Sequence, residues 1–398
     1  MKIREGSVTS PSGFLAAGTS CGLKESGKLD LALLVSEKPA VLSAVFTINR
    51  VKAAPVLRGM KLLARGSARA FLVNSGCANA CTGDDGLRDA DDTAAAAAAA
   101  LEVSSDDVFI ASTGVIGETL DTEKIRKAVV GLAGSLSNEG GKKFARAIMT
   151  TDTVPKTAAV NIKLSGGTVS VGGCSKGAGM ISPKMATMLA FFTTDAEVPA
   201  DKLAEVFRAA VDLSFNRITI DGHMSTNDTA VIMANGASGI GLVTEDDAEA
   251  FSEGLTLLCR HLAREMVRDG EGATKLVEIE VTGAPSDDGA EDIARRIADS
   301  PLVKCAINGA DPNWGRIVSA AGCAGVEFDP ADVTLDIGAV RVFEKGVPST
   351  FDRTQAADHM NGKEVCLVLS VGAGKGSACL WTCDLSAEYV EINAEYTT

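Results

Sequence analysis

The sequence has few histidines, no Cys-x-x-Cys pair and no long apolar run, and each absence excludes a class of protein. Three histidines and ten scattered cysteines give no zinc-ligand spacing, so we expect no metal site. The cysteines are better explained as buried free thiols in a reducing compartment. No apolar run approaches the ~20 residues that a membrane span requires, so we expect no membrane partner.

Positive charge is also scarce. The 398 residues include 38 Lys and Arg against 52 Asp and Glu, which gives a formal net charge of −14. Nucleic-acid binding needs clustered Lys and Arg, so we expect no nucleic-acid partner. The chain starts with charged residues that have no apolar core behind them, which is not the pattern of a secretory signal. We therefore expect a cytoplasmic protein.

Two glycine-rich segments invite a nucleotide-binding interpretation, and neither has the required spacing. In the segment 372–377, Gly376 follows the lysine where a phosphate loop needs Ser or Thr. We expect this segment to form a turn between two strands. The segment 173–179 lacks the spacing of a dinucleotide fingerprint and leads to Pro183 rather than to a helix. We expect no cofactor.

Apolar patterning predicts strands and helices that are interleaved without a regular βαβ order. We expect strands at 29–36, 41–47, 69–74, 107–112, 158–164, 168–173, 188–192, 217–220 and 230–234. We expect helices at 87–101, 122–136 with Asp121 as its cap, 200–213 and 246–267. The pattern favours an α+β fold in which helices cover the faces of sheets.

The length of the chain suits two or three domains. The helix at 246–267 carries one apolar stripe at three- and four-residue spacing, which is typical of a buried helix face. From residue 277 onward the pattern changes to strands and short helices. We therefore expect a soft domain boundary near residue 280, with 281–398 as a C-terminal α+β domain.

Thr187 closes a glycine-rich loop that begins at Lys176, and a short apolar run of strand type follows it. Most such threonines are β-branched residues that start a strand. Alternatively, the backbone could be cut directly before Thr187. The new terminal amino group of Thr187 would then serve as base for its hydroxyl. Position alone favours the first interpretation.

Two further positions each allow two interpretations. Thr113 and Gly114 follow a predicted strand, and such a pair commonly forms a turn. A Thr–Gly pair at a strand end can also direct a hydroxyl and backbone N–H groups at a developing oxyanion. Glu271 stands between two glycines directly after the long helix. A carboxylate there is usually a solvated helix-end residue, but it could also hold an ammonium group.

Several segments together resemble the ornithine acetyltransferase family. The most specific is Met-Ala-Thr-Met-Leu at 185–189, within a match over 176–189. Two others are Gly-Phe-Leu-Ala-Ala-Gly at 13–18 and Asn-Ser-Gly-Cys-Ala-Asn-Ala-Cys-Thr-Gly at 74–83. The remaining segments follow in the order of the family: 112–117, 149–153, 225–229, 269–275, 311–316 and 393–398. The resemblance runs essentially from end to end.

The resemblance implies a precursor that cuts its own backbone between Ala186 and Thr187. Residues 1–186 would form an α chain and residues 187–398 a β chain, and the two would stay associated. Thr187 would then be an N-terminal nucleophile that takes acetyl from N-acetylornithine and passes it to glutamate through an acetyl ester. This ping-pong reaction is the glutamate N-acetyltransferase step of arginine biosynthesis. A terminal α-amino group, with a pKa near ~8, suits the role of base for the hydroxyl.

The resemblance also assigns site residues. It places Thr113 and Gly114 in the oxyanion hole. It assigns substrate contacts to Thr151, Lys176, Thr187, Glu271, Asn393 and Thr398. By charge, Lys176 suits a substrate carboxylate and Glu271 an ammonium group. One departure is at His223 and Met224, where the family usually carries an acid and a small residue, so the local detail there stays open.

The fold that the resemblance implies is a layered α-β-β-α sandwich of the self-processing ornithine acetyltransferase type, with a smaller C-terminal α+β domain. For Asn393 and Thr398 to contact substrate, the C-terminal tail must return to the active site. The implied assembly is a heterotetramer of two α and two β chains. No cofactor is implied.

Three alternatives remain open. The enzyme could be bifunctional and also use acetyl-CoA as donor, which would make it an N-acetylglutamate synthase as well. It could be a related self-cleaving aminopeptidase or amidohydrolase that passes the acyl group to water. It could also be an uncleaved binding protein without enzymatic activity.

Overall fold

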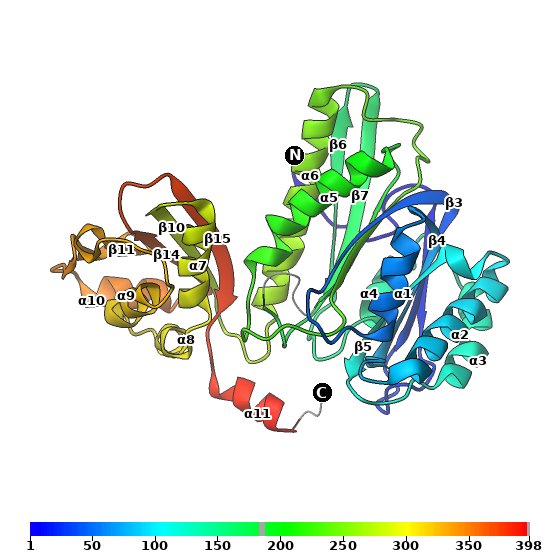
Figure 1. Ribbon diagram of the computed structural model, residues 1–398, viewed down its shortest axis with the longest axis horizontal. Helices are drawn as coiled ribbons and strands as arrows, with labels where there is room; N and C mark the ends of the chain where they lie inside the picture. The colour runs from blue at the N-terminus through cyan, green and yellow to red at the C-terminus, as the bar shows by residue number, and fades with distance from the viewer. Residues whose placement is uncertain (183–187, 396–398) are drawn as a thin grey trace.

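Two β-sheets with helices packed on them make up the computed structural model, which describes residues 1–182 and 188–395 (Figure 1). In this part of the chain the first sheet has the strand order β1-β6-β7-β8-β9-β3-β4-β5, and β2 pairs with β3. Its strands are β1 (Ile3–Arg4), β2 (Phe14–Thr19), β3 (Leu31–Phe46), β4 (Ser67–Cys77), β5 (Val108–Val115), β6 (Lys156–Leu164), β7 (Gly167–Lys176), β8 (Leu189–Thr194) and β9 (Thr229–Ala234).

The strand β3 belongs to both halves of this sheet. Its first part pairs with β4 and its last part with β9, with a register irregularity between Val35 and Ala40. The sequence predicted two strands here, at 29–36 and 41–47, and this was wrong. The polar residues of 36–39 mark the irregularity within one long strand and not a loop, because a bulge re-aims a strand without ending it.

Alternate side chains of the strands point into different apolar layers, which gives the α-β-β-α order. Leu34, Phe71 and Phe191 lie in the middle layer, between the two halves of the sheet. Their neighbours Leu33 and Ala70 face α2 (Gly83–Leu101) and α3 (Thr122–Ala133). On the other outer side, β6 to β9 face α5 (Ala200–Asp212) and α6 (Glu245–Arg268). The predicted α+β sandwich is confirmed.

Local signals explain where the principal helices begin. Asp121 caps α3 by accepting the backbone N–H of Lys124, as predicted. The helix α6 begins at a capping box in which Thr244 and Asp247 bond each other's backbone. The alanine tract lies on α2, where the buried alanines allow the helix to pack closely on the sheet. The remaining helices of this region are α1 (Ala54–Leu63) and α4 (Gly141–Ala147).

One predicted strand is absent. The segment 217–220 was expected to be a strand, but it follows the short 3-10 helix η2 (Phe215–Arg217), and only Ile218 forms a bridge, with Trp381. Its apolar residues Ile218 and Ile220 are buried beneath α6, so burial produced the strand-like pattern without a ladder. The remaining 3-10 helices of the described residues are η1 (Ser105–Asp107) and η3 (Pro330–Asp332).

The second sheet has the order β13-β12-β11-β14-β10-β15 and its own apolar core. Its strands are β10 (Leu276–Ala284), β11 (Thr334–Ile337), β12 (Val340–Glu344), β13 (Val347–Pro348), β14 (Glu364–Ser370) and β15 (Gly376–Cys383). Its helices are α7 (Asp287–Ala298), α8 (Pro301–Asn308), α9 (Trp314–Gly322) and α10 (Arg353–Met360). The position expected for a boundary, near residue 280, lies within β10. Of the turn predicted at 372–377, residues 372–375 lie between β14 and β15, and Gly376 and Ser377 begin β15.

The last helix, α11 (Ala387–Glu395), leaves the second sheet and runs back beneath the first (Figure 1). Three side-chain contacts hold it there. Ser386 donates to the carbonyl of Gly272, the hydroxyl of Tyr389 donates to Asp221, and the amide of Asn393 donates to Glu271. The chain segment before Thr398 therefore returns to the N-terminal layers.

In the ranges 1–182 and 188–395, no group of three or more His, Cys, Asp and Glu side chains could hold a metal ion. No helix of these ranges combines the length and the apolar character needed to cross a membrane. All ten cysteines lie in the described ranges and are free thiols. The expectation that they are buried was wrong for Cys81, Cys305 and Cys323, which are exposed in a loop, on the outer face of α8 and at the end of α9.

Candidate active site

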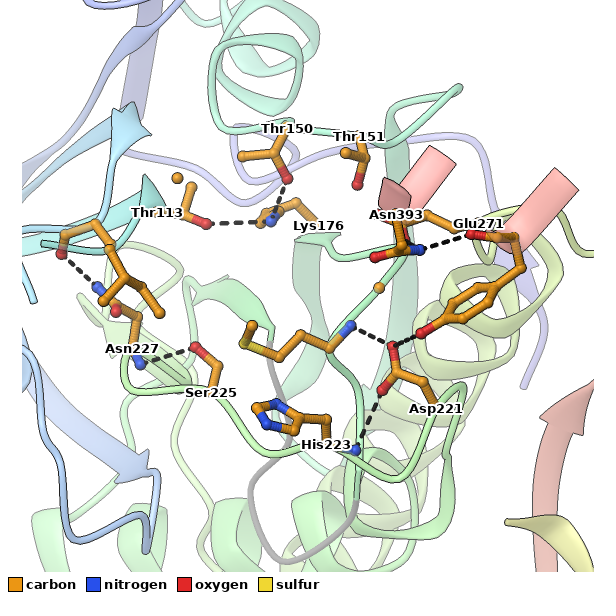
Figure 2. Close-up of a pocket in the computed structure, with 16 residues that line it drawn as sticks. Thr113, Thr150, Thr151, Lys176, Asp221, His223, Ser225, Asn227, Glu271 and Asn393 are labelled. Carbon is orange, nitrogen blue, oxygen red and sulfur yellow. Dashed lines mark hydrogen bonds between the residues drawn. The ribbon is translucent and has the colours of Figure 1, made fainter. Parts of the chain in front are cut away.

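A cavity of about 450 Å³ lies where the ends of β5 and β7 meet α11 (Figure 2). Its lining combines small, hydroxyl and charged residues from segments that are far apart in the sequence. The lining residues are Ala78, Thr113, Gly114, Ile116, Thr150, Thr151, Lys176, Gly179, Met180, Asp221, His223, Ser225, Asn227, Glu271, Tyr389 and Asn393.

Most of the residues predicted from the sequence converge on this cavity. The lining includes both members of the expected oxyanion pair and four expected substrate contacts: Thr113, Gly114, Thr151, Lys176, Glu271 and Asn393. Three predicted positions, Ala186, Thr187 and Thr398, lie outside the described residues. The structure thus brings together every predicted site residue that it describes.

Thr113 and Gly114 reach the cavity as the end of a strand. The sequence allowed a turn here, but β5 continues to Val115 and pairs in parallel with β4. Gly114 lies opposite Gly76 with a φ of 132°, and a Cβ on Gly114 would come within 2.3 Å of the carbonyl carbon of Gly76. Only glycine fits there. The register of two strands therefore fixes the backbone of this pair.

Asn227 fastens the facing loop to the same strand end. Its side-chain amide donates to the carbonyl of Ala78 at 2.7 Å and to the carbonyl of Ser112 at 2.8 Å. Its backbone N–H donates to the hydroxyl of Ser225 at 3.0 Å (Figure 2). Because Asn227 is buried, these bonds hold two walls of the cavity at a fixed separation.

Lys176, the last residue of β7, is a buried cation that contacts Thr113. Its Nζ donates to the hydroxyl of Thr150 at 2.7 Å and to that of Thr113 at 3.2 Å (Figure 2). Burial lowers the pKa of Lys176, while the charge of Asp152 acts to raise it. Since the hydroxyl of Thr113 accepts from Lys176, its own proton remains available for a group in the cavity.

Glu271 closes the opposite side. Its backbone N–H donates to the carbonyl of Ala178 at 2.8 Å, and its carboxylate accepts from Asn393 at 2.8 Å. Gly179 leaves room for this carboxylate, because a Cβ on Gly179 would lie 2.4 Å from a carboxylate oxygen. Glu271 is only 9% exposed, so the interpretation as a solvated helix-end residue was wrong. The loop after α6 folds inward because its backbone pairs with the segment after β7.

Asp221 and Tyr389 are site residues that the sequence analysis missed. Asp221 accepts the backbone N–H groups of Met180 at 2.6 Å and Ile181 at 2.9 Å, and the hydroxyl of Tyr389 at 3.3 Å. Burial raises the pKa of Asp221 and outweighs these N–H donors. The only available signal was an Asp-Gly pair after an apolar segment, which is also a common turn.

The chain is fixed on both sides of residues 183–187. On the near side, the carbonyl of Ile181 accepts the backbone N–H of Ile220 at 2.8 Å. On the far side, the backbone N–H of Met188 donates to Asp228 at 3.0 Å, and its carbonyl accepts the N–H of Thr229 at 3.0 Å. Burial raises the pKa of Asp228 well above its usual value. Both ends of the segment that contains Thr187 therefore start from buried, hydrogen-bonded positions.

His223 and Met224 differ in their relation to the cavity. His223 is exposed and lines the cavity. Its backbone N–H donates to the carboxylate of Asp221 at 3.2 Å (Figure 2). Met224 lies beside the lining, and its carbonyl accepts the side-chain amide of Asn49 at 3.1 Å. The departure from the family pattern therefore places an imidazole at the cavity and leaves the loop anchored.

The arrangement suits a small molecule that carries both charges of an amino acid. Lys176 supplies a cation at one side, and Glu271 and Asp221 supply carboxyl groups at the other. Beside Lys176, the hydroxyl of Thr113 and the backbone of Gly114 offer the donors that an oxyanion requires. Chemically, the cavity can orient a zwitterion and stabilise a tetrahedral acyl-transfer intermediate.

Comparisons with known proteins find relatives over nearly the whole chain. A family model described as "ArgJ family" matches residues 15–398. The chain is 46% identical over 409 residues to the "Arginine biosynthesis bifunctional protein ArgJ" of Synechocystis sp., covering 100% of this chain and 99% of that relative. It is 48% identical over 399 residues to the protein of the same name from Gloeobacter violaceus, covering 99% and 98% of the two chains.

Solved structures are also similar. The crystal structure of the arginine biosynthesis bifunctional protein argJ from Bacillus halodurans matches at 41% identity with a TM-score of 0.50. The match covers 52% of this chain and 98% of that one. The ornithine acetyltransferase from Mycobacterium tuberculosis, solved with ornithine, matches at 44% identity with a TM-score of 0.44, covering 46% of this chain and 98% of that one.

Proposed function

Because this chain belongs to the ArgJ family of arginine-biosynthesis proteins, we propose that it is a glutamate N-acetyltransferase. It takes the acetyl group of N-acetylornithine, releases ornithine and passes the acetyl group to glutamate. Both substrates carry a carboxylate, and the released product carries ammonium groups, which suits a cavity with Lys176 at one side and Glu271 at the other.

The nucleophile in this proposal is Thr187, made N-terminal by self-cleavage after Ala186. Its hydroxyl oxygen attacks the acetamide carbonyl, and its α-amino group takes the hydroxyl proton and returns it to the leaving amine. The amine of glutamate then attacks the carbonyl carbon of the acetyl ester and the bond to the Thr187 oxygen breaks. The α-amino group of Thr187 transfers a proton from the attacking amine to this oxygen, which restores the hydroxyl. Two observations support the cut. The chain is anchored at Ile181 and at Met188, on the two sides of the segment that contains Thr187. The solved Bacillus halodurans chain is matched over 98% of its length by only 52% of this chain, as expected if that chain is one of two fragments.

Thr113 and Gly114 donate to the oxyanion, and Thr151, Lys176, Glu271, Asn393 and Thr398 contact the substrates. The observation that carries the proposal is that the members of this set that the structure describes all line one cavity. Met180 also lines it, and the chain is anchored at Ile181 and Met188, on the two sides of the segment that contains Thr187. We further propose that the cleaved chains assemble as two α and two β chains in the cytoplasm.

Mass analysis under denaturing conditions, together with an ornithine-release assay, tests the proposal. The protein is expected as two fragments cut at Ala186–Thr187, and release of ornithine is expected to require glutamate as the acyl acceptor. Thr187→Ala is expected to stay uncut and to release no ornithine. Thr113→Ala keeps the nucleophile and is expected to lower kcat about 10²-fold to 10³-fold, since it removes one oxyanion donor.

An intact chain that transfers acetyl at full rate, or a Thr187→Ala variant with unchanged activity, would contradict the mechanism. Ornithine release that is equally fast without glutamate would identify a hydrolase. A protein that binds N-acetylornithine but turns over neither substrate would identify a binding protein.

A second activity is suggested by the word "bifunctional" in the names of the relatives. We propose that acetyl-CoA also acylates Thr187, which would make N-acetylglutamate without N-acetylornithine. The purified protein with acetyl-CoA and glutamate alone is expected to form N-acetylglutamate, and Thr187→Ala is expected to abolish this reaction. No product with acetyl-CoA would limit the enzyme to the transfer between amino acids.

A further inference from the structure

A buried lysine outside the cavity joins three of its walls. Lys156, the first residue of β6, is 3% exposed and does not line the cavity. Its Nζ lies 2.6 Å from a carboxylate oxygen of Asp152 and 2.6 Å from one of Asp269. Asp152 is bonded to the lining residue Thr150, and Asp269 lies two residues before the lining residue Glu271.

Asp152 connects Lys156 to the segment 150–151 and to the end of β7. One of its oxygens accepts the backbone N–H of Gly177 at 2.7 Å, directly after Lys176. The other accepts the backbone N–H of Thr150 at 3.0 Å. The hydroxyl of Thr150 accepts a hydrogen bond from the ammonium group of Lys176. The carboxylate of Asp152 therefore positions the backbone on both sides of this hydrogen bond, at Thr150 and next to Lys176.

Asp269 connects Lys156 to the Glu271 loop. It lies at the end of α6, two residues before Glu271, and its carboxylate accepts the backbone N–H of Thr153 at 3.1 Å and the hydroxyl of the same residue. The carboxylate of Asp269 is therefore held by Lys156 and Thr153 together. Because Gly270 is the one residue between Asp269 and Glu271, a displaced Asp269 displaces the Glu271 loop as well.

The charges in this cluster are balanced. Lys156 and Lys176 face Asp152 and Asp269, two cations against two carboxylates. Burial alone would raise the pKa of Asp152, but the charges of Lys156 and Lys176 and the N–H of Gly177 lower it to about 2. Loss of the Lys156 charge would leave two buried carboxylates facing one buried cation, and a buried charge without a partner is costly.

We propose that Lys156 is a positioning residue for substrate binding, which sets the relative placement of Thr150, Lys176 and Glu271 through Asp152 and Asp269. The inference rests on the proposed function, because Lys176 and Glu271 are its substrate contacts. The backbone of Thr113 and Gly114 is held independently, by the β4–β5 register and by Asn227. Lys156 therefore acts on KM and leaves kcat nearly unchanged.

The test is a steady-state comparison of the wild type with Lys156→Met, with rates expressed per cleaved chain. The KM for N-acetylornithine is expected to rise about 10-fold or more, because loss of binding that is equal in the ground state and the transition state raises KM alone. The value of kcat is expected to fall less than about 3-fold. Lys156→Arg keeps the charge and is expected to recover most of the loss in KM.

Two further variants separate positioning from a loss of stability. Arg58→Met removes a mostly buried cation that bonds Asp91 and the carbonyls of Ser105 and Val108, at the end of β5 away from the cavity. It is expected to lower the melting temperature and leave KM unchanged. Asp269→Asn keeps the shape of the side chain, removes one carboxylate and is expected to raise KM as Lys156→Met does, so it carries the test if Lys156→Met does not fold.

An unchanged KM in the folded Lys156→Met and Asp269→Asn variants would overturn the inference, as would an equal rise in KM for Arg58→Met. A kcat loss larger than the KM change would overturn it too. A wild-type protein without acetyl transfer would refute the proposed function instead, and that control is measured first.

Discussion

The two sides of the cavity are held by different kinds of interaction. On one side, which we call the strand wall, Thr113 and Gly114 are placed by the ladder between β4 and β5. On the other, which we call the tail wall, Asp221, Glu271 and Asn393 are placed by side-chain bonds to loops and to α11. The strand wall depends on backbone geometry and the tail wall on charge and hydrogen bonding.

This difference matches what each wall is proposed to do. An oxyanion hole needs donors at fixed positions before the reaction begins, and a strand ladder supplies rigid donors. Substrate binding must serve two amino acids with different side chains, and a wall made of side chains can adjust to both. We therefore expect changes in the strand wall to lower kcat and changes in the tail wall to raise KM.

The largest effect is expected for Gly114→Ala. The added Cβ would lie 2.3 Å from the carbonyl carbon of Gly76, at a φ of 132° that alanine rarely adopts, so the strand end must move. We expect kcat to fall about 10³-fold, as for the loss of an oxyanion donor. The control is Gly117→Ala, which also has a positive φ but has open space around it. An equal loss in both variants would show that the strand wall is no more constrained than the loop after it.

The second prediction concerns the cluster of Lys156, Asp152 and Asp269. We expect it to make the free energy of unfolding depend on pH in the acid range. Asp152 has its pKa lowered to about 2, so its contribution to stability is complete above its unfolded pKa near ~4 and is lost as the pH falls through about 2. We expect this loss to reach about 2 kcal/mol in the free energy of unfolding. Urea unfolding between pH 5 and pH 2, in a Thr187→Ala background that keeps one chain, would measure it. Asp152→Asn is expected to show a smaller pH dependence, and an identical one would refute the assignment.

The third effect is expected for Gly179→Ala in the tail wall. The new Cβ would lie 2.4 Å from the carboxylate of Glu271, which must turn away. We expect the KM for N-acetylornithine to rise about 10-fold with kcat within about 3-fold of the wild type. Gly131→Ala on α3, where nothing lies within 4 Å, is the matched control and is expected to leave both constants unchanged. A fall in kcat alone for Gly179→Ala would contradict the expectation that changes in the tail wall raise KM.

The smallest effect is expected for Tyr389→Phe, which removes the 3.3 Å bond from the Tyr389 hydroxyl to Asp221 and keeps the ring. We expect KM to rise about 2-fold, the effect of one long, half-exposed hydrogen bond. Burial raises the pKa of Tyr389, so the hydroxyl stays protonated and the effect should not change between pH 6 and pH 9. A pH-dependent difference between the two proteins would show that the hydroxyl does more than anchor α11.

The sequence predicted elements with a strong local pattern and failed where distant residues decide. The helix expected at 246–267 is α6, Glu245–Arg268, because its apolar stripe and its capping residues are local signals. The two strands expected at 29–36 and 41–47 are one, because β3 continues by pairing with β4 and then with β9. No local pattern contains those partners.

The site shows the same division. Motif resemblance named Thr113, Lys176, Glu271 and Asn393, and all four line one cavity. It did not find Tyr389 or Lys156, whose roles come from Asp221 and Asp269, partners that are distant in the sequence. A lone tyrosine on a terminal helix and a lone lysine at a strand start carry no pattern of their own.

The place of β8 and β9 in the first sheet has a consequence for the proposed cleavage. Both strands follow Thr187, and they lie between β7 and β3, which precede it. After the proposed cleavage the second fragment would be held by strand pairing on both edges of β8 and β9, and separating the fragments would open the middle of the sheet. Once the fragments are apart, refolding requires two molecules to meet, so recovery depends on protein concentration. Cleavage would thus turn a reversible folding reaction into a nearly one-way step, and the lifetime of the enzyme would be set by the rate of unfolding.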